Sequence, residues 1–175
     1  MFNKPAGCIT ATYDENFPTV MDYFSDYHFS DKLFPVGRLD IDTEGLLIIT
    51  TDGLLAHRLA HPKWKIEKEY YAVVEGNAFD IDTEKIKKGI KLKDGYQTKP
   101  FEIKVLSESE ILITITEGKY HIVKRIMETL SHPVKYLKRI RIGNLKLDEN
   151  LSTGEFRELT EEEIKSLKSL VSIKE

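Results

Sequence analysis

The chain has 175 residues, of which 41% are apolar and 10% aromatic, and this composition excludes a disordered protein because it can bury a sizeable core. No run approaches the roughly 18 to 20 apolar residues of a membrane span, and the opening MFNKPAG has no apolar signal region, so we expect a soluble, cytoplasmic protein. The net charge of −3 argues against a chain that is basic throughout, and the single cysteine, Cys8, excludes an intramolecular disulfide.

The apolar patterns predict an α+β fold, because the expected strands cluster instead of alternating regularly with helices. In chain order, we expect a helix over 19–25, a strand over 45–51, a helix over 54–60, strands over 70–75, 101–106 and 111–116, a helix over 121–130, a long strand over 134–147 and a helix over 161–171. No repeat or flexible linker divides the chain, so residues 1–175 are expected to form one domain with two lobes.

Charge is distributed unevenly along the chain. Residues 119–141 contain seven Lys or Arg and one acid, whereas residues 148–175 contain eight acids and four bases. A basic run of this kind is most often a solvated face, but it is also the pattern of a surface that binds RNA phosphates. Local basicity therefore leaves RNA binding open despite the acidic total.

The densest polar cluster is the loop in residues 36–53, where Asp40, Asp42 and Glu44 precede an apolar run. Three carboxylates beside a buried strand suit acid-base, nucleophilic or metal chemistry, although such side chains also cap turns without any function. A calcium loop is disfavoured because its twelfth position, counted from Asp40, is Thr51 instead of Glu. His57 and His61 have the spacing of a zinc pair but no evident third ligand, so no metal site is predicted.

Five ordered motifs extend the pattern beyond this loop. They are NKPAG (3–7), GRLDIDTEGLLIITTDG (37–53), KEYYAV (68–73), EGKYHIVKRIM (117–127) and GEFRELTEEE (154–163). Together they make nearly the whole chain resemble the RsuA-like family of ribosomal RNA pseudouridine synthases. The resemblance implies that family's fold, a mixed, mostly antiparallel central sheet with flanking helices and an active-site cleft.

The resemblance also implies roles for individual residues. Asp40 takes the position of the catalytic nucleophile, and Tyr70 that of the aromatic residue that stacks on the flipped base. Lys124 is expected beside the aspartate, with Arg125 as the alternative, and Arg38 is expected to contact phosphate or fill the gap left by the flipped nucleotide. The residues expected to bind RNA are Lys4, Lys119, His121, Lys138, Arg139 and Arg141.

Two departures from the family pattern bear on activity. Ile122 stands where the third motif usually has Gln, which removes a polar group. The sequence also starts at the first motif, so we expect the protein to lack the small N-terminal RNA-binding domain common in the family. We expect a monomer that acts on ribosomal RNA, most simply the small-subunit 16S rRNA, without metal or organic cofactor. The alternatives are a catalytically silent RNA-binding or ribosome-assembly protein, and a nucleoside or glycoside hydrolase that pairs Asp40 with Asp42 or Glu44.

Overall fold

A mixed sheet of eight strands forms the centre of the structure, a computed structural model that describes residues 1–174. The strands are β1 (Phe2–Lys4), β2 (Phe34–Val36), β3 (Glu44–Thr50), β4 (Lys68–Val74), β5 (Glu102–Val105), β6 (Glu110–Ile115), β7 (Val134–Ile142) and β8 (Leu145–Lys146). The helices are α1 (Gly53–Ala60), α2 (Ile122–Thr129) and α3 (Glu161–Leu170), with short 3₁₀ helices at Val20–Phe24, Ser30–Lys32, Pro62–Trp64 and Ala78–Asp80.

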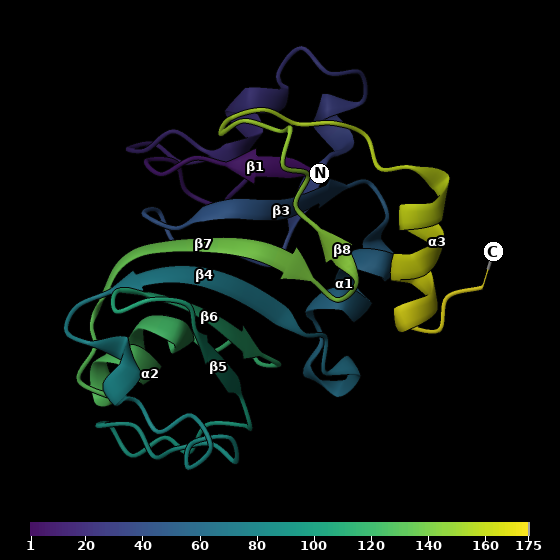
Figure 1. The fold of residues 1–175 in the computed structure, drawn as a ribbon. Coiled ribbons are helices and arrows are strands. Elements are labelled where there is room, and N and C mark those ends of the chain that lie inside the picture. Colours follow the sequence, from purple (N-terminus) through teal and green to yellow (C-terminus); the bar gives the residue numbers. More distant parts are fainter. Residues whose placement is uncertain (175) are drawn as a thin grey trace.

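The strand order is β1-β3-β7-β4-β6-β5, with β2 paired to β3 and β8 paired to β7 (Figure 1). Among the paired strands of residues 1–174, β3 and β7 run parallel, and all the other pairs are antiparallel. A mostly antiparallel sheet with three α-helices confirms the predicted α+β class. No helix in residues 1–174 is long and apolar enough to cross a membrane.

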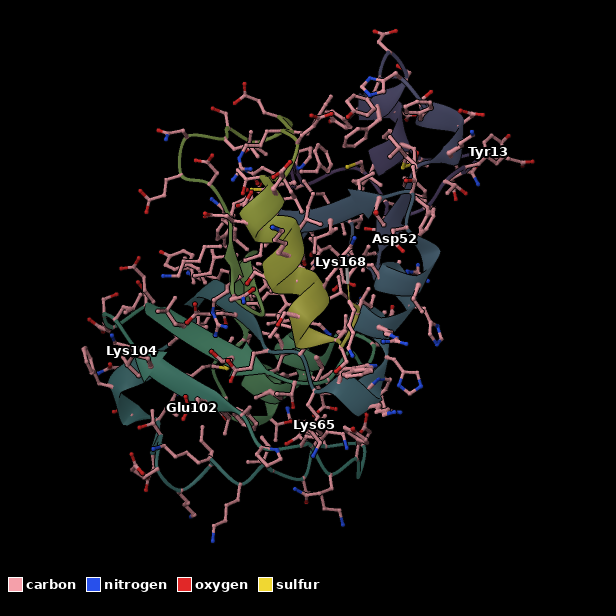
Figure 2. The ribbon with its side chains drawn as sticks, turned by 90° about the vertical axis from the view of Figure 1, so that its right-hand side faces the viewer. Tyr13, Asp52, Lys65, Glu102, Lys104 and Lys168 are labelled. Atoms are coloured by element: carbon pink, nitrogen blue, oxygen red, sulfur yellow. The ribbon has the colours of Figure 1, made fainter. Side chains whose placement is uncertain are left out.

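Alternation along β3 builds two hydrophobic clusters. Leu47 belongs to one cluster, while its neighbours Leu46 and Ile48 belong to the other, because successive side chains of a strand point to opposite faces. The first cluster contains the buried side of α2, including Ile126, and the second contains buried residues of α1 and α3, including Leu167. In Figure 1, α2 lies near one end of the sheet, whereas α1 and α3 lie near the other. In Figure 2, α3 crosses the end that faces the viewer.

The short strand β1 is held from two directions. It pairs antiparallel with β3, where Phe2 is opposite Leu47. The C-terminal segment covers it as well, because the backbone N–H of Asn3 donates to the carbonyl of Glu155 at 3.0 Å and the N–H of Gly154 donates to the carbonyl of Asn3 at 2.7 Å. Strand β1 is therefore held by β3 and by residues 154–155, far along the sequence.

Element bounds follow the sequence prediction except where turns or short segments intervene. The α-helices begin and end within two residues of the predicted limits, and Asp52 and Thr160 cap α1 and α3 through their side chains. The expected strand over 134–147 is wrong, because Gly143, with φ +57°, turns the chain into the hairpin β7–β8. The expected helix over 19–25 is a 3₁₀ helix, Val20–Phe24.

A bulge interrupts β7 where it passes β4. Tyr70 is opposite Arg139 and Glu69 is opposite Arg141, so Ile140 has no opposite residue. Without the extra residue, Arg139 and Arg141 would share one face of the strand, and with it they point to opposite faces. The bulge therefore separates two arginines that the sequence predicts to act together.

Candidate active site

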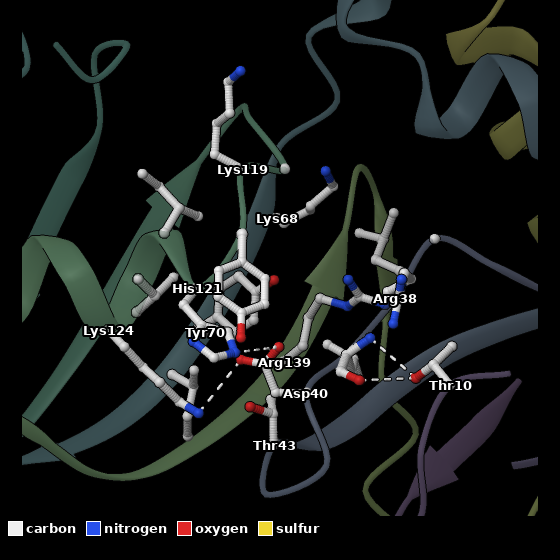
Figure 3. Close-up of a pocket in the computed structure, with 18 of the residues that line it drawn as sticks. Thr10, Arg38, Asp40, Thr43, Lys68, Tyr70, Lys119, His121, Lys124 and Arg139 are labelled. Atoms are coloured by element: carbon white, nitrogen blue, oxygen red, sulfur yellow. Dashed lines mark hydrogen bonds and ion pairs between the residues drawn. The ribbon is translucent and has the colours of Figure 1, made fainter. Parts of the chain in front are cut away.

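A cleft of about 750 Å³ opens between the loop that joins β2 to β3 and the N-terminal end of α2. It is lined by residues from several separate segments of the chain, among them Thr10, Arg38, Asp40, Lys68, Tyr70, Glu117, Lys119, His121, Lys124 and Arg139 (Figure 3). Asp40 and Lys124 meet in this cleft, although strands β3 to β6 lie between them in the sequence. The resemblance-based prediction of an active-site cleft around Asp40 thus has a physical counterpart.

Lys4 fixes the loop that carries Asp40. Its side chain is completely buried, and its ammonium donates to the carbonyls of Pro5 at 2.9 Å, Asp40 at 3.0 Å and Thr43 at 2.9 Å. Burial lowers the pKa of Lys4, because desolvation disfavours the charged ammonium. The hydrogen bonds to these carbonyl dipoles offset that cost. The expected RNA contact is wrong for Lys4, because the ammonium is enclosed by the loop.

Replacing Lys4 tests this anchoring role. Lys4→Met is expected to lower the free energy of unfolding by about 3 kcal/mol, because buried carbonyls lose their donor. Lys146→Met, an exposed change on β8, is the matched control and should stay within about 0.5 kcal/mol of the wild type. Urea denaturation of both variants measures the difference, and equal stability would contradict an anchoring role.

Asp40 lies between two basic side chains. One carboxylate oxygen is 3.2 Å from Nε2 of His121 and the other is 3.4 Å from Nζ of Lys124 (Figure 3). Lys124 also donates to Asp42 at 2.6 Å, and this hydrogen bond lowers the pKa of Asp42. Partial burial disfavours the ammonium, but the two carboxylates outweigh it and raise the pKa of Lys124, which keeps a positive charge beside Asp40.

His121 reaches Asp40 because of its place at the start of α2. It precedes the helix with φ +49°, a left-handed conformation that is uncommon for residues other than glycine. The ring of Tyr120, which is 76% exposed, stacks on the imidazole with centroids 3.7 Å apart. We expected His121 to contact RNA, and the structure instead brings it to the carboxylate of Asp40.

The sheet forms the floor of the cleft. Tyr70 of β4 and Arg139 of β7 stand opposite each other and are 8% and 4% exposed. The guanidinium of Arg139 donates through Nε to the carbonyl of Leu46 at 2.9 Å, while its Nη2 is buried without a partner in residues 1–174. Lys68 precedes Tyr70 by two residues on β4. Burial, together with the positive charge of Arg139, lowers the pKa of Lys68 to about 8.

Close backbone packing brings Arg139 to this position. Gly45 of β3 lies beside Arg139, and a Cβ added to Gly45 would be 2.2 Å from the carbonyl oxygen of Arg139. Gly45 also has φ +110°, a conformation that side chains disfavour. The glycine that follows the acidic loop is therefore required by the contact between β3 and β7.

Besides Lys4, three of the expected site residues lie outside the cleft. Arg125 pairs with Asp94 and donates to the carbonyl of Tyr120 at 3.0 Å, so it is directed away from Asp40, contrary to the pocket role considered for it. Arg141 pairs with Glu67 at 3.3 Å, on the face of the sheet opposite to Arg139. Lys138 is half-buried on β7 and does not line the cleft.

Several cleft residues were not predicted. Thr10 accepts from the N–H of Leu39 at 3.1 Å and donates to its carbonyl at 2.9 Å, which braces the loop next to Asp40. Glu117, 6% exposed, accepts from the hydroxyl of Tyr96 at 2.6 Å. Thr10 carried no motif signal, whereas Lys68 and Glu117 stand in the KEYYAV and EGKYHIVKRIM motifs and could have been found there.

Ile122, which replaces the usual Gln, is the first residue of α2 and is 5% exposed. It packs in the first hydrophobic cluster and also lines the cleft. An apolar side chain at this position is accommodated by its neighbours, so the departure creates no buried polar group without a partner.

Sequence comparisons place the chain among known proteins. Residues 1–129 match the RNA pseudouridylate synthase family. The chain is 47% identical over 175 residues to an uncharacterized RNA pseudouridine synthase of Aquifex aeolicus, covering 98% of this chain and 71% of that protein. It is 43% identical over 168 residues to ribosomal small subunit pseudouridine synthase A of Salmonella typhimurium, covering 95% of this chain and 72% of that protein.

A solved structure shows the same fold. The crystal structure of a pseudouridylate synthase superposes with a TM-score of 0.88 at 38% sequence identity, covering 95% of this chain and 71% of that one. The similarity in sequence and the similarity in fold thus point to the same family. The chain is therefore a member of the RsuA-like RNA pseudouridine synthases and an enzyme of that family.

Proposed function

We propose that this enzyme isomerises a specific uridine of small-subunit 16S rRNA to pseudouridine, with Asp40 as the nucleophile. The observation that carries the proposal is the carboxylate of Asp40, held in the cleft between His121 and Lys124 at 3.2 and 3.4 Å. The choice of rRNA rests on the relatives named ribosomal small subunit pseudouridine synthase A, which are 39 to 43% identical to this chain.

The chemistry requires a carboxylate that stays ionised. The N1–C1′ bond of the uridine breaks with its electron pair going to the base, the uracil rotates, and C5 bonds to C1′. C5 then releases its proton and N1 gains one, so atoms and electrons balance without an external oxidant or group donor. Asp40 attacks the nucleotide or stabilises the electron-poor sugar, and Lys124 favours the anionic carboxylate that either role needs.

The walls of the cleft suit an extruded nucleotide. A uridine stacked in RNA is out of reach, so it must be flipped out at a cost of a few kcal/mol. Tyr70, buried on β4 beside Asp40, supplies an aromatic face that returns about 1 to 3 kcal/mol by stacking. Arg38 is exposed at the cleft and has no hydrogen bond or ion pair in residues 1–174, so it is free to contact phosphate or fill the gap in the RNA.

The cleft mouth is the expected RNA interface. Lys119 lines the cleft, and its ammonium lies 5.5 Å from the centre of the Tyr96 ring. We expect the dissociation constant for rRNA to rise steeply with salt, and Lys119→Gln to reduce the slope of log affinity against log salt by about 0.7 to 0.9. Filter binding between 50 and 200 mM salt measures both, and an affinity that does not depend on salt would contradict the interface.

Mapping the product tests the proposed function as a whole. Purified protein is incubated with 16S rRNA, 23S rRNA and small-subunit assembly intermediates, and pseudouridine is located by chemical sequencing. A single new pseudouridine in 16S rRNA is the expected result. A modified site in 23S rRNA would overturn the substrate assignment, and binding without any product would favour a catalytically silent RNA-binding protein.

A further inference from the structure

Lys68 is a cation in the cleft whose ammonium forms no salt bridge in residues 1–174. Its side chain lines the cleft from β4, yet its ammonium has no hydrogen bond or ion pair within the described residues. A partly buried ammonium normally gains such a partner, because desolvation otherwise disfavours its charge. Figure 3 shows Lys68 on the same side of the cleft as Lys119, away from the contacts of Asp40.

The charged groups around Lys68 do not neutralise it. Arg139 on β7 adds a second positive charge from the floor, and its Nη2 is buried without a partner in residues 1–174. Glu117, the acid that faces Lys68 from the segment after β6, already accepts from the hydroxyl of Tyr96 at 2.6 Å and from the N–H of Lys99 at 2.8 Å. Its carboxylate is therefore held by other donors.

The remaining acids of the cleft, Asp40 and Asp42, are also engaged, Asp42 through the ammonium of Lys124 at 2.6 Å. Asp40 contacts His121 and Lys124 and has no contact with Lys68. The cluster formed by Lys68, Arg139 and Glu117 thus carries more positive than negative charge and opens on the space beside Tyr70. Oxygen atoms with negative charge are the groups that such a cluster binds.

Local geometry places this charge where a nucleotide would lie. Lys68 and Tyr70 are two residues apart on β4 and both line the cleft, and the bulge at Ile140 keeps Arg139 opposite Tyr70. Gly118 lies close to the ammonium, since a Cβ there would be 3.6 Å from Nζ of Lys68, an ordinary van der Waals distance. An aromatic face and two cations therefore border the same space.

We infer that Lys68 and Arg139 form an anion subsite that binds a negatively charged oxygen of the flipped uridine nucleotide. The inference rests on the proposed function. The oxygen has two possible sources, the phosphate attached to the target nucleotide and the uracil carbonyl that carries charge once the electron pair of the N1–C1′ bond has moved to the base. Both are anionic oxygens within one nucleotide of the reacting bond.

The subsite has a pH signature. Burial and Arg139 lower the pKa of Lys68 to about 8, so the free enzyme loses this positive charge as the pH rises through that value. If the ammonium binds substrate, kcat/KM falls by about fivefold between pH 8 and pH 9, following the protonated fraction. Lys68→Arg keeps its charge over this range and is expected to remove the decline.

The test compares wild type, Lys68→Met, Lys68→Arg and the control Lys104→Met in steady-state assays on 16S rRNA. Lys104 is an exposed lysine on the edge strand β5 (Figure 2) and does not line the cleft. A phosphate ligand predicts a higher KM for Lys68→Met and a salt slope lower by about 0.7 to 0.9. A uracil ligand predicts kcat lower by about 10²- to 10³-fold with RNA affinity unchanged.

Titration by NMR separates this subsite from the proposed function. Wild type with labelled lysine is titrated with uridine 5′-monophosphate and with uridine, and the expected result is a rise in the pKa of Lys68 with the monophosphate, whether or not rRNA is modified. An unchanged pKa with both ligands, together with a Lys68→Met variant that keeps kcat, KM and the pH profile of the control, would overturn the inference. Thermal melting of each variant shows that it is folded.

Discussion

Asp40→Asn is expected to abolish pseudouridine formation, lowering kcat/KM by at least about 10⁴-fold, the order lost when enzymes lose a nucleophile. The amide has nearly the same shape but no negative charge, so it neither attacks the nucleotide nor balances an electron-poor sugar. RNA affinity should stay within about threefold of the wild type, because the phosphate contacts that dominate binding are unchanged. Pseudouridine mapping and filter binding on the same protein preparation measure both quantities.

Asp42→Asn is the matched control for this prediction. Asp42 also pairs with Lys124, at 2.6 Å, but its side chain is 67% exposed compared with 29% for Asp40. Its loss frees Lys124 without removing the carboxylate in the cleft, so we expect activity to fall no more than about tenfold. Abolished activity in Asp42→Asn and retained activity in Asp40→Asn would exchange the roles of the two residues.

Gly45→Ala is expected to cost at least about 4 kcal/mol of unfolding free energy, the largest stability effect predicted for a single methyl group in this protein. The added Cβ would lie 2.2 Å from the carbonyl oxygen and 2.7 Å from the nitrogen of Arg139. Both atoms belong to the backbone of β7, so no side chain can rotate to relieve the overlap. The left-handed conformation of Gly45, φ +110°, adds further strain.

Gly53→Ala provides the control for the same chemical change. Gly53 is the first residue of α1, and a Cβ there has nothing within 4 Å. Alanine favours the helix over glycine, so we expect a gain of up to about 1 kcal/mol. Urea denaturation of both variants gives the comparison, and a Gly45→Ala protein within 1 kcal/mol of wild type would show that β3 and β7 can separate without loss of stability.

The parts of the structure that were predictable share a local signal. The helix over 54–60 has a cap at Asp52, and the helix over 161–171 has one at Thr160. Residues next to each helix therefore indicate where it begins. The proximity of Asp40 and Lys124 came from ordered motifs and not from periodicity. A resemblance carries spatial information between distant segments that no local pattern holds.

Other features depend on tertiary contacts and could not be predicted. Strand β1 has three residues, too few for an alternating pattern, and it exists because β3 and the C-terminal segment bond to it. Lys4 departs from the rule that lysines lie at the surface. It is buried because its ammonium donates to the carbonyl of Asp40, 36 residues away in the sequence, and no local pattern indicates that contact.

The arginines illustrate the same limit. Arg139 and Arg141 look equivalent in sequence, but the bulge at Ile140 sends one to the cleft and the other to Glu67. Arg125 follows Lys124 on α2 and is taken by Asp94, a partner from the long connection between β4 and β5. Motif position alone therefore does not fix the direction of a side chain.

The contact between β1 and the C-terminal segment has a consequence for biosynthesis. Asn3 is adjacent to Lys4, the anchor of the Asp40 loop, and it exchanges backbone hydrogen bonds with Gly154 and Glu155. A nascent chain lacks those partners until most of it has been translated and has left the ribosome. The loop that carries Asp40 therefore acquires its full support only once residues 154 and 155 have emerged, later than every segment that lines the cleft.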